Sequence, residues 1–235
     1  ENEQAKMTST LRILLGEHWP EPASAKWALL DGTGKPLRTG EGEPRSWPPA
    51  ERTEAILNGP QTNWLKVRVP RANVREQAQA LGFALEEQMV READSQHITP
   101  SLRGEETWDV LVVARERLKR LQAQFEAISR PLDGAFSIMQ SLPAEADAWV
   151  LAASESSLIV RSEAHGGWSE DLVSGEEAPI LLVTALQTAR EGGKQPARLI
   201  LRGESQGLAL GEWEKALGLA IETGKPWTWF ELAIG

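Results

Sequence analysis

Residues 73–98 carry the clearest periodic signal in the chain, and any fold must give this segment a surface to cover. Its apolar residues recur at steps of three or four, the spacing of one stripe of an α-helix. They are Val74, Ala78, Leu81, Leu85 and Met89, and we expect Phe83 and Val90 to widen the stripe. Asn73 is a candidate N-cap with Glu76 three residues later, a capping-box spacing. The pattern predicts an amphipathic helix that packs on a sheet.

The same segment offers a candidate surface for a partner protein. We expect Gln79, Glu86, Arg91 and Glu92 to point away from the apolar stripe. A solvated helix face is the simpler interpretation of these polar residues, and a partner-binding face is the alternative.

Composition narrows the class of protein. The 235 residues are 41% hydrophobic and 25% charged, which is typical of globular chains. The net charge of −9 argues against a nucleic-acid partner, since neutralising phosphates requires a basic face. The absence of cysteine excludes disulfides and thiolate metal sites, and three scattered histidines give no zinc spacing. We expect neither a metal nor a cofactor.

No apolar run approaches the roughly 18–20 residues that a membrane-spanning helix needs. The longest run, residues 178–186, is about half that length. The first six residues, ENEQAK, lack the apolar core of a secretory signal. We expect the natural chain to start at Met7, with ENEQAK left over from cloning, and this segment to be soluble.

The first part of the chain predicts short strands. Residues 11–15, 27–31 and 36–39 are strand candidates, a helix is expected at 50–57, and 64–69 alternates as a half-buried strand. This order is strand–strand–strand–helix–strand.

Residues 71–131 predict a small unit of their own. The helix described above precedes strands at 97–99 and 108–114, and a second amphipathic helix follows at 116–129. We expect both helices to pack on this hairpin, with Leu121 and Phe125 facing inward like Leu81 and Leu85. The block is interpreted as an inserted α-β-β-α domain.

The last part repeats the order of the first. Strands are expected at 149–154 and 157–163, a turn at 166–168, a helix at 179–190, a strand at 197–202, a helix at 213–221 and a closing strand at 227–232. The prediction is a β-rich α/β fold of two ribonuclease-H-like units around a small inserted domain. The expected domains are 7–70 with 132–146 returning to it, 71–131, and 147–235.

A family resemblance rests on the first helix. The run ALGFALEEQM from Ala80 to Met89, followed by His97 in an extended segment, resembles the cytoplasmic part of general secretion pathway protein L, a component of the type II secretion inner-membrane platform. Gly82 and Met89 stand where that family commonly has proline and leucine. A weaker similarity extends over most of the chain, including Val69-Pro70 and the closing WFELAIG.

The resemblance implies an actin-like fold and a scaffolding function. Its implied partners are the N-terminal domain of the secretion ATPase and, for the full-length protein, the M, F and C platform components; a homodimer is left open. It also implies a single-pass protein of the bacterial inner membrane, with this segment on the cytoplasmic face.

Two short motifs carry alternative functions. Asp31-Gly32-Thr33-Gly34 has the letters of an actin-like phosphate hairpin, but it follows the second strand and not the first, so an ordinary β-turn is the simpler interpretation. Gly203-Glu204-Ser205-Gln206-Gly207 matches GxSxG after a strand. A hydrolase triad of that type needs a later histidine, and none follows His165.

The remaining signals favour no catalytic residue. The carboxylate pairs Glu86-Glu87, Glu105-Glu106 and Glu176-Glu177 are interpreted as solvated faces. Ten tryptophans without a tyrosine are read as apolar anchors, a few of them at interfaces. We therefore predict a non-enzymatic scaffold of type II secretion. The alternatives are an actin-like nucleotide-binding protein of pilus assembly or cell division and, less favoured, a GxSxG hydrolase.

Overall fold

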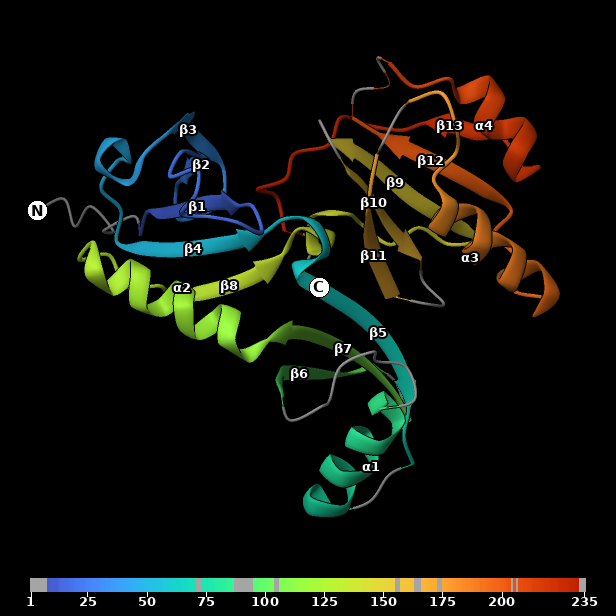
Figure 1. Cartoon of the computed structure of the whole chain (residues 1–235), viewed down its shortest axis with the longest axis horizontal. Helices are drawn as coiled ribbons and strands as arrows, with labels where there is room; N and C mark the ends of the chain where they lie inside the picture. The colour runs from blue at the N-terminus through green and yellow to red at the C-terminus, as the bar shows by residue number, and fades with distance from the viewer. Residues whose placement is uncertain are drawn as a thin grey trace, which may run out of the picture.

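The computed structural model of the protein describes residues 8–70, 73–86, 95–103, 106–154, 157–162, 166–172, 175–203, 205 and 207–232. Its strands form two sheets that stand side by side, each with helices on its outer face (Figure 1). Among the described residues, no helix combines the length and the hydropathy needed to cross a bilayer.

The first sheet has five strands in the order β3-β2-β1-β4-β8. They are β1 (Thr10–Leu15), β2 (Ala25–Leu30), β3 (Pro36–Gly42), β4 (Arg52–Leu57) and β8 (Gly134–Ser137). The first three strands form antiparallel hairpins, while β4 pairs parallel to β1 and β8 pairs parallel to β4. A short 3₁₀ turn, η1 (Pro44–Ser46), lies in the connection from β3 to β4.

The helix expected at residues 50–57 is wrong, because this segment is β4. Its last five residues are all buried, since the strand is paired on both edges and covered on both faces. A run of that kind has no alternation to distinguish it from a buried helix. The buried Glu54 holds two ion pairs, from Arg12 at 2.9 Å and from Arg52 at 3.0 Å.

The second sheet has eight strands in the order β13-β12-β9-β10-β11-β5-β7-β6. They are β5 (Thr62–Arg68), β6 (Gln96–Arg103), β7 (Thr107–Ala114), β9 (Ala148–Ser154), β10 (Ser157–Ser162), β11 (Gly166–Asp171), β12 (Arg198–Arg202) and β13 (Ile221–Thr223). Strands β9, β10 and β11 are antiparallel, and β12 and β13 add in parallel, as β4 and β8 do in the first sheet. The predicted duplication is therefore present.

Three strand predictions in this sheet need correction. The strand at residues 64–69 does not complete the first unit; as β5 it pairs with β7 and joins β11 at Trp64 and Gly167. The expected turn at 166–168 is the start of β11, with a positive φ at Gly166. The closing strand at 227–232 is absent, and the parallel β13 takes its place; the chain beyond it leaves the sheet after Gly224.

The helices cover the outer faces of the sheets. They are α1 (Val74–Glu86), α2 (Arg115–Ala127), α3 (Ile180–Glu191) and α4 (Leu210–Leu217). Helix α2 runs along the first sheet, α3 and α4 lie on the second, and α1 covers the part formed by β5, β7 and β6 (Figure 1). Two further 3₁₀ turns, η2 (Gly59–Gln61) and η4 (Ile138–Ser141), lead into β5 and out of β8.

The packing of α2 differs from the expectation. Leu121 and Phe125 do not pack on the β6–β7 hairpin; they belong to the core of the first sheet, where Phe125 contacts the Trp19 and Trp47 rings. Arg117 fixes the helix to the same sheet by donating to the carbonyls of Gly16 and Trp19 at 2.8 and 2.9 Å. The division into three domains stays a prediction. The contacts of helix α2 group it with the first sheet.

A third core joins the two halves. It contains Ile56 of the first sheet and Val150 and Ile159 of the second, with the C-terminal segment packed against it through Trp227 and Trp229. Further along the same segment, the Phe230 carbonyl accepts a hydrogen bond from Arg12 on β1. The chain after β13 therefore returns from the second half to the first.

Candidate partner-binding surface

Helix α1 is held on its strands by a cap and an apolar face. The Asn73 side chain accepts a hydrogen bond from the Glu76 backbone N–H at 3.0 Å, which confirms the predicted N-cap. Leu81 and Leu85 are buried against Val67, Val110 and other residues of β5 and β7. This anchoring gives the opposite face of the helix a fixed orientation.

The outward face of α1 is not purely polar. Phe83, expected in the buried stripe, is 60% exposed. It lies two residues from both Leu81 and Leu85, so it is turned about 200° from each of them at 100° per residue. Gln79, four residues before it on the same stripe, is exposed as predicted. The structure thus presents an aromatic ring beside a predicted site residue.

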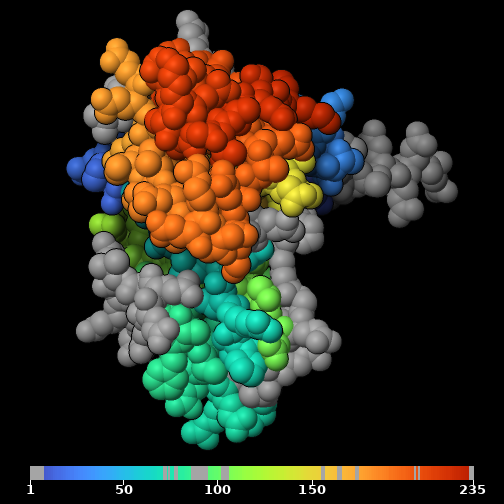
Figure 2. Space-filling model, turned by 90° about the vertical axis from the view of Figure 1, so that its right-hand side faces the viewer, coloured from blue at the N-terminus to red at the C-terminus, as the bar shows by residue number. Residues whose placement is uncertain are grey.

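The other predicted site residues are only partly described. Glu86 is the last residue of α1, three positions after Phe83, and its side chain lies outside the described part. Arg91 and Glu92, like Met89 and Val90, also lie outside the described residues. Figure 2 shows the α1 region at one end of the molecule, away from the α3 and α4 surface. The outward face of α1 is our candidate partner-binding surface.

In the candidate phosphate hairpin, the Asp31 carboxylate is hydrogen-bonded within its own turn. Its Oδ1 atom accepts hydrogen bonds from the backbone N–H of Thr33 at 2.8 Å and of Lys35 at 3.0 Å, and from the Thr33 hydroxyl at 2.6 Å. These bonds lower the pKa of the Asp31 carboxyl, the Thr33 hydroxyl having the largest effect. The motif forms the β2–β3 turn, which supports the simpler interpretation.

The GxSxG motif forms a loop between β12 and α4. The Ser205 carbonyl accepts a hydrogen bond from the Leu208 N–H at 3.1 Å, and the residue is exposed. Glu204 and Gln206 lie outside the described residues, as does His165. No hydrogen bond between Ser205 and a histidine occurs in the described part of the chain, and that part holds no cluster of metal-ligating side chains.

The acidic pairs include exposed residues, whereas the tryptophans are buried or half-buried. Glu176 and Glu177 are exposed, and Glu106 pairs with Arg68 at 3.2 Å; Glu87 and Glu105 lie outside the described residues. All ten tryptophans are buried or half-buried, so none is a free surface ring. The expectation that a few tryptophans lie at interfaces stays a prediction, and the exposed phenylalanine is Phe83.

The sequence did not predict the raised pKa of one carboxyl, that of Glu170. Glu170 on β11 is buried and accepts hydrogen bonds from the Leu181 N–H at 2.9 Å and the Trp168 indole at 3.2 Å. Burial raises its pKa, and the hydrogen bonds only partly oppose that effect. The group lies at the N-terminus of α3 and caps that helix. Sequence reasoning missed it because only the fold brings β11 to this helix.

Comparison with known proteins gives a consistent result. The family model of type II secretion system protein L matches residues 59–185, more than half of the chain. A protein L from Klebsiella pneumoniae is 25% identical over 173 residues, which cover 71% of this chain and 43% of that protein. The chain therefore spans less than half the length of this relative.

Two known structures share the fold. The cytoplasmic domain of EpsL, an inner-membrane component of the type II secretion system of Vibrio cholerae, aligns with a TM-score of 0.73 at 16% identity, covering 96% of this chain and 93% of that one. The PilM–PilN type IV pilus biogenesis complex aligns with a TM-score of 0.55 at 12% identity, covering 96% and 90%. These alignments confirm the predicted actin-like fold class.

Proposed function

The chain belongs to the type II secretion system protein L family, and from that premise we propose that it is a non-enzymatic scaffold that docks the secretion ATPase. Proteins of this family are structural components of a secretion machine. Docking of the ATPase is the specific task we assign to this chain, with the outward face of α1 as the contact surface.

The exposed ring of Phe83 carries this proposal. A large apolar side chain that is 60% exposed does not gain most of the free energy that full burial would contribute. Aromatic residues at the centre of an interface often dominate the binding energy. Phe83 also lies on a helix whose inner face is firmly packed, so a partner meets a preformed surface.

The family also suggests where the scaffold acts. We propose that the full-length protein lies in the inner membrane, that this part faces the cytoplasm, and that the M, F and C platform components are its other partners. The chain covers less than half of its Klebsiella relative, so contacts with those components can involve regions outside it.

A pull-down tests the proposed function. This protein is immobilised and the purified N-terminal domain of the cognate secretion ATPase is applied at micromolar concentration. We expect stoichiometric retention, and an unrelated ATPase domain of similar charge serves as control. Failure of the cognate domain to bind at about 100 μM, or equal retention of both domains, would refute the proposal.

A further inference from the structure

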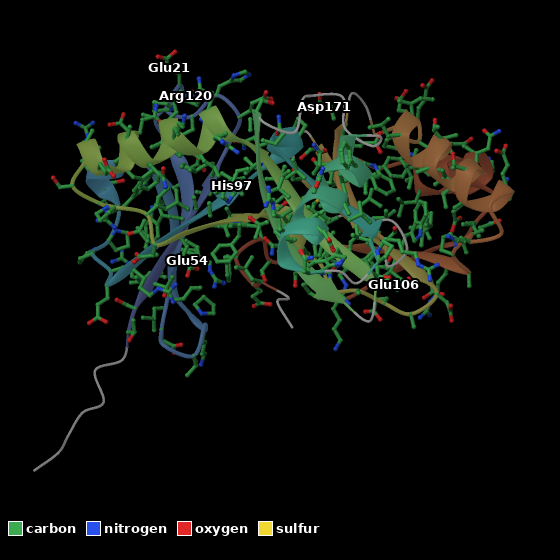
Figure 3. The ribbon with its side chains drawn as sticks, turned by 90° about the horizontal axis from the view of Figure 1, so that it is seen from below. Glu21, Glu54, His97, Glu106, Arg120 and Asp171 are labelled. Atoms are coloured by element: carbon green, nitrogen blue, oxygen red, sulfur yellow. The ribbon has the colours of Figure 1, made fainter. Side chains whose placement is uncertain are left out.

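A groove of about 440 Å³ lies on the side of the β6–β7 hairpin, between this hairpin, α2 and β8. Its walls include Leu111 and Val113 of β7, Leu118 of α2 and Phe136 of β8. His97 of β6, also in the wall, lies beside α2 in Figure 3. The groove is separate from the outward face of α1, to which we assign the ATPase.

The strands contribute to the groove in two different ways. From β6, the residues that line it are His97 and Thr99, which alternate as residues on one face of a strand do. From β8 the four residues 134–137 line it, and from β7 the three residues 111–113. Strand β7 is paired on both edges, whereas β8 is the last strand of its sheet and lies on the side that faces β7 (Figure 1). The groove therefore runs along the edge of β8.

That edge is the outer edge of the first sheet. Strand β8 pairs with β4 on one side, and among the described strands none pairs with it on the other. The outer strand of a sheet presents alternate N–H and C=O groups to an added strand. Here those groups face an apolar trough, which provides pockets for alternate side chains.

The charges around the groove indicate the chemistry of the added strand. Exposed Arg115 and Lys119 of α2 are on the rim, in a protein whose net charge is −9. The carboxylate in the lining, Asp133, accepts a hydrogen bond from the Thr53 backbone N–H at 2.7 Å. The lining thus holds two cations and one carboxylate, and a carboxylate of the added strand would compete for Lys119 with Glu116, which pairs with it at 3.2 Å.

We propose that this groove binds an extended segment of a partner protein, rich in alternating apolar and acidic residues, as an added strand on β8. The backbone of the segment pairs with the edge of β8, its apolar side chains lie on Leu111 and Val113, and its carboxylates face Lys119. This site is independent of the ATPase site, so the failure of either proposal leaves the other standing.

The test uses the blocked hexapeptide EVEVEV and the ¹⁵N-labelled protein at fixed concentration. We expect saturable amide shifts at residues 134–137 and at Thr99 and Leu111. Two EVEVEV peptides are made, one N-methylated at the odd-numbered amides and the other at the even-numbered amides. One of the two should bind at least tenfold more weakly than EVEVEV. The peptide KVKVKV should not bind. Equal affinity of all analogues, or no shifts up to about 1 mM EVEVEV, would overturn the proposal.

A matched pair of variants tests the charge. Lys119 and Lys215 are both exposed and both pair with a glutamate three residues earlier, at 3.2 and 2.7 Å. Lys119→Glu should weaken EVEVEV binding at least threefold, while Lys215→Glu on α4 should leave it unchanged. An equal effect of both variants contradicts the site. Shifts of residues 134–137 on raising the protein concentration without peptide would assign the groove to a second copy of the chain instead.

Discussion

Gly166 at the start of β11 lies directly against the backbone carbonyl of Trp64 on β5, so closely that a Cβ atom at Gly166 would overlap that carbonyl oxygen. The contact stands where the paired residues Trp64 and Gly167 join β5 to β11 in the eight-stranded sheet. The Arg161 guanidinium covers the Trp64 ring at 4.3 Å from its centroid and donates to the Leu142 carbonyl. Strands β5 and β11 of the second sheet thus meet at a site that excludes a side chain.

Gly166→Ala should therefore destabilise the fold. The φ of +77° at Gly166 alone costs an alanine about 1–2 kcal/mol, and the overlap with Trp64 adds about 1–3 kcal/mol. Gly193→Ala is the matched control, since Gly193 has a φ of +65° but open space around it. Urea unfolding measures both free energies, and an equal loss for the two variants would show that the contact with Trp64 contributes nothing.

Arg117 offers a second test of how the first half is held together. Its buried guanidinium donates to the carbonyls of Gly16 and Trp19 and to the Gln61 side chain at 2.9 Å. Arg117→Met should leave these oxygens without their donor and lower the free energy of unfolding by about 3 kcal/mol.

The neighbouring Arg120 is exposed on the same helix and gives the control (Figure 3). Arg120→Met should change the free energy of unfolding by less than about 0.5 kcal/mol. If Arg117→Met changes the free energy of unfolding as little as Arg120→Met does, the hydrogen bonds of Arg117 do not stabilise the packing of α2.

Glu170 predicts a dependence of stability on pH. Its pKa is raised in the folded protein by burial, so at pH values between the unfolded and folded pKa the folded state binds more protons. The contribution of Glu170 to stability should therefore increase as the pH falls through its folded-state pKa toward 4.5, the ordinary pKa of a glutamate carboxyl. Glu170→Gln should flatten this part of the stability profile, as urea midpoints at a series of pH values would show. An unchanged slope would mean that another group titrates there.

The nucleotide-binding alternative makes the opposite prediction to ours. Asp31 accepts three hydrogen bonds within its own turn, so we expect no heat when ATP and Mg²⁺ are titrated into the protein at tens of micromolar. Saturable heat that disappears in Asp31→Asn would favour an actin-like nucleotide-binding protein.

The sequence predicts elements best where local patterns and packing agree. The stripe containing Leu81 and Leu85, the N-cap at Asn73 and the helix α3 follow local rules, and the structure confirms them. The segment of β4 does not, because its burial on both faces comes from sheet neighbours that lie far away in the sequence.

Long-range packing also explains the errors around the candidate surface. Leu121 and Phe125 have the spacing of a helix face, but spacing does not tell which sheet the face meets, and they meet the first sheet. The exposure of Phe83 could have been found from its 200° offset from Leu81 and Leu85. Glu170 could not, because its burial depends on the contact between β11 and α3.

Variants of α1 separate docking from folding. Leu85 is fully buried, so Leu85→Ala should cost about 2–5 kcal/mol of folding stability. Charge reversal at Glu86 or Arg91, predicted from the sequence to face outward, should weaken ATPase binding by about 1 kcal/mol or more with little change in Tm. A lower Tm without weaker binding for these reversals would assign both residues to folding instead.

The most direct measurement is the affinity of the ATPase N-terminal domain for Phe83→Ala by titration calorimetry. Leu37 on β3 is similarly exposed, at 54% against 60% for Phe83, so Leu37→Ala controls for the loss of an apolar surface group. We predict that Phe83→Ala raises Kd at least tenfold, about 1.4 kcal/mol, while Leu37→Ala leaves it unchanged. Wild-type affinity for Phe83→Ala, or a loss for Leu37→Ala alone, would contradict docking on the outward face of α1.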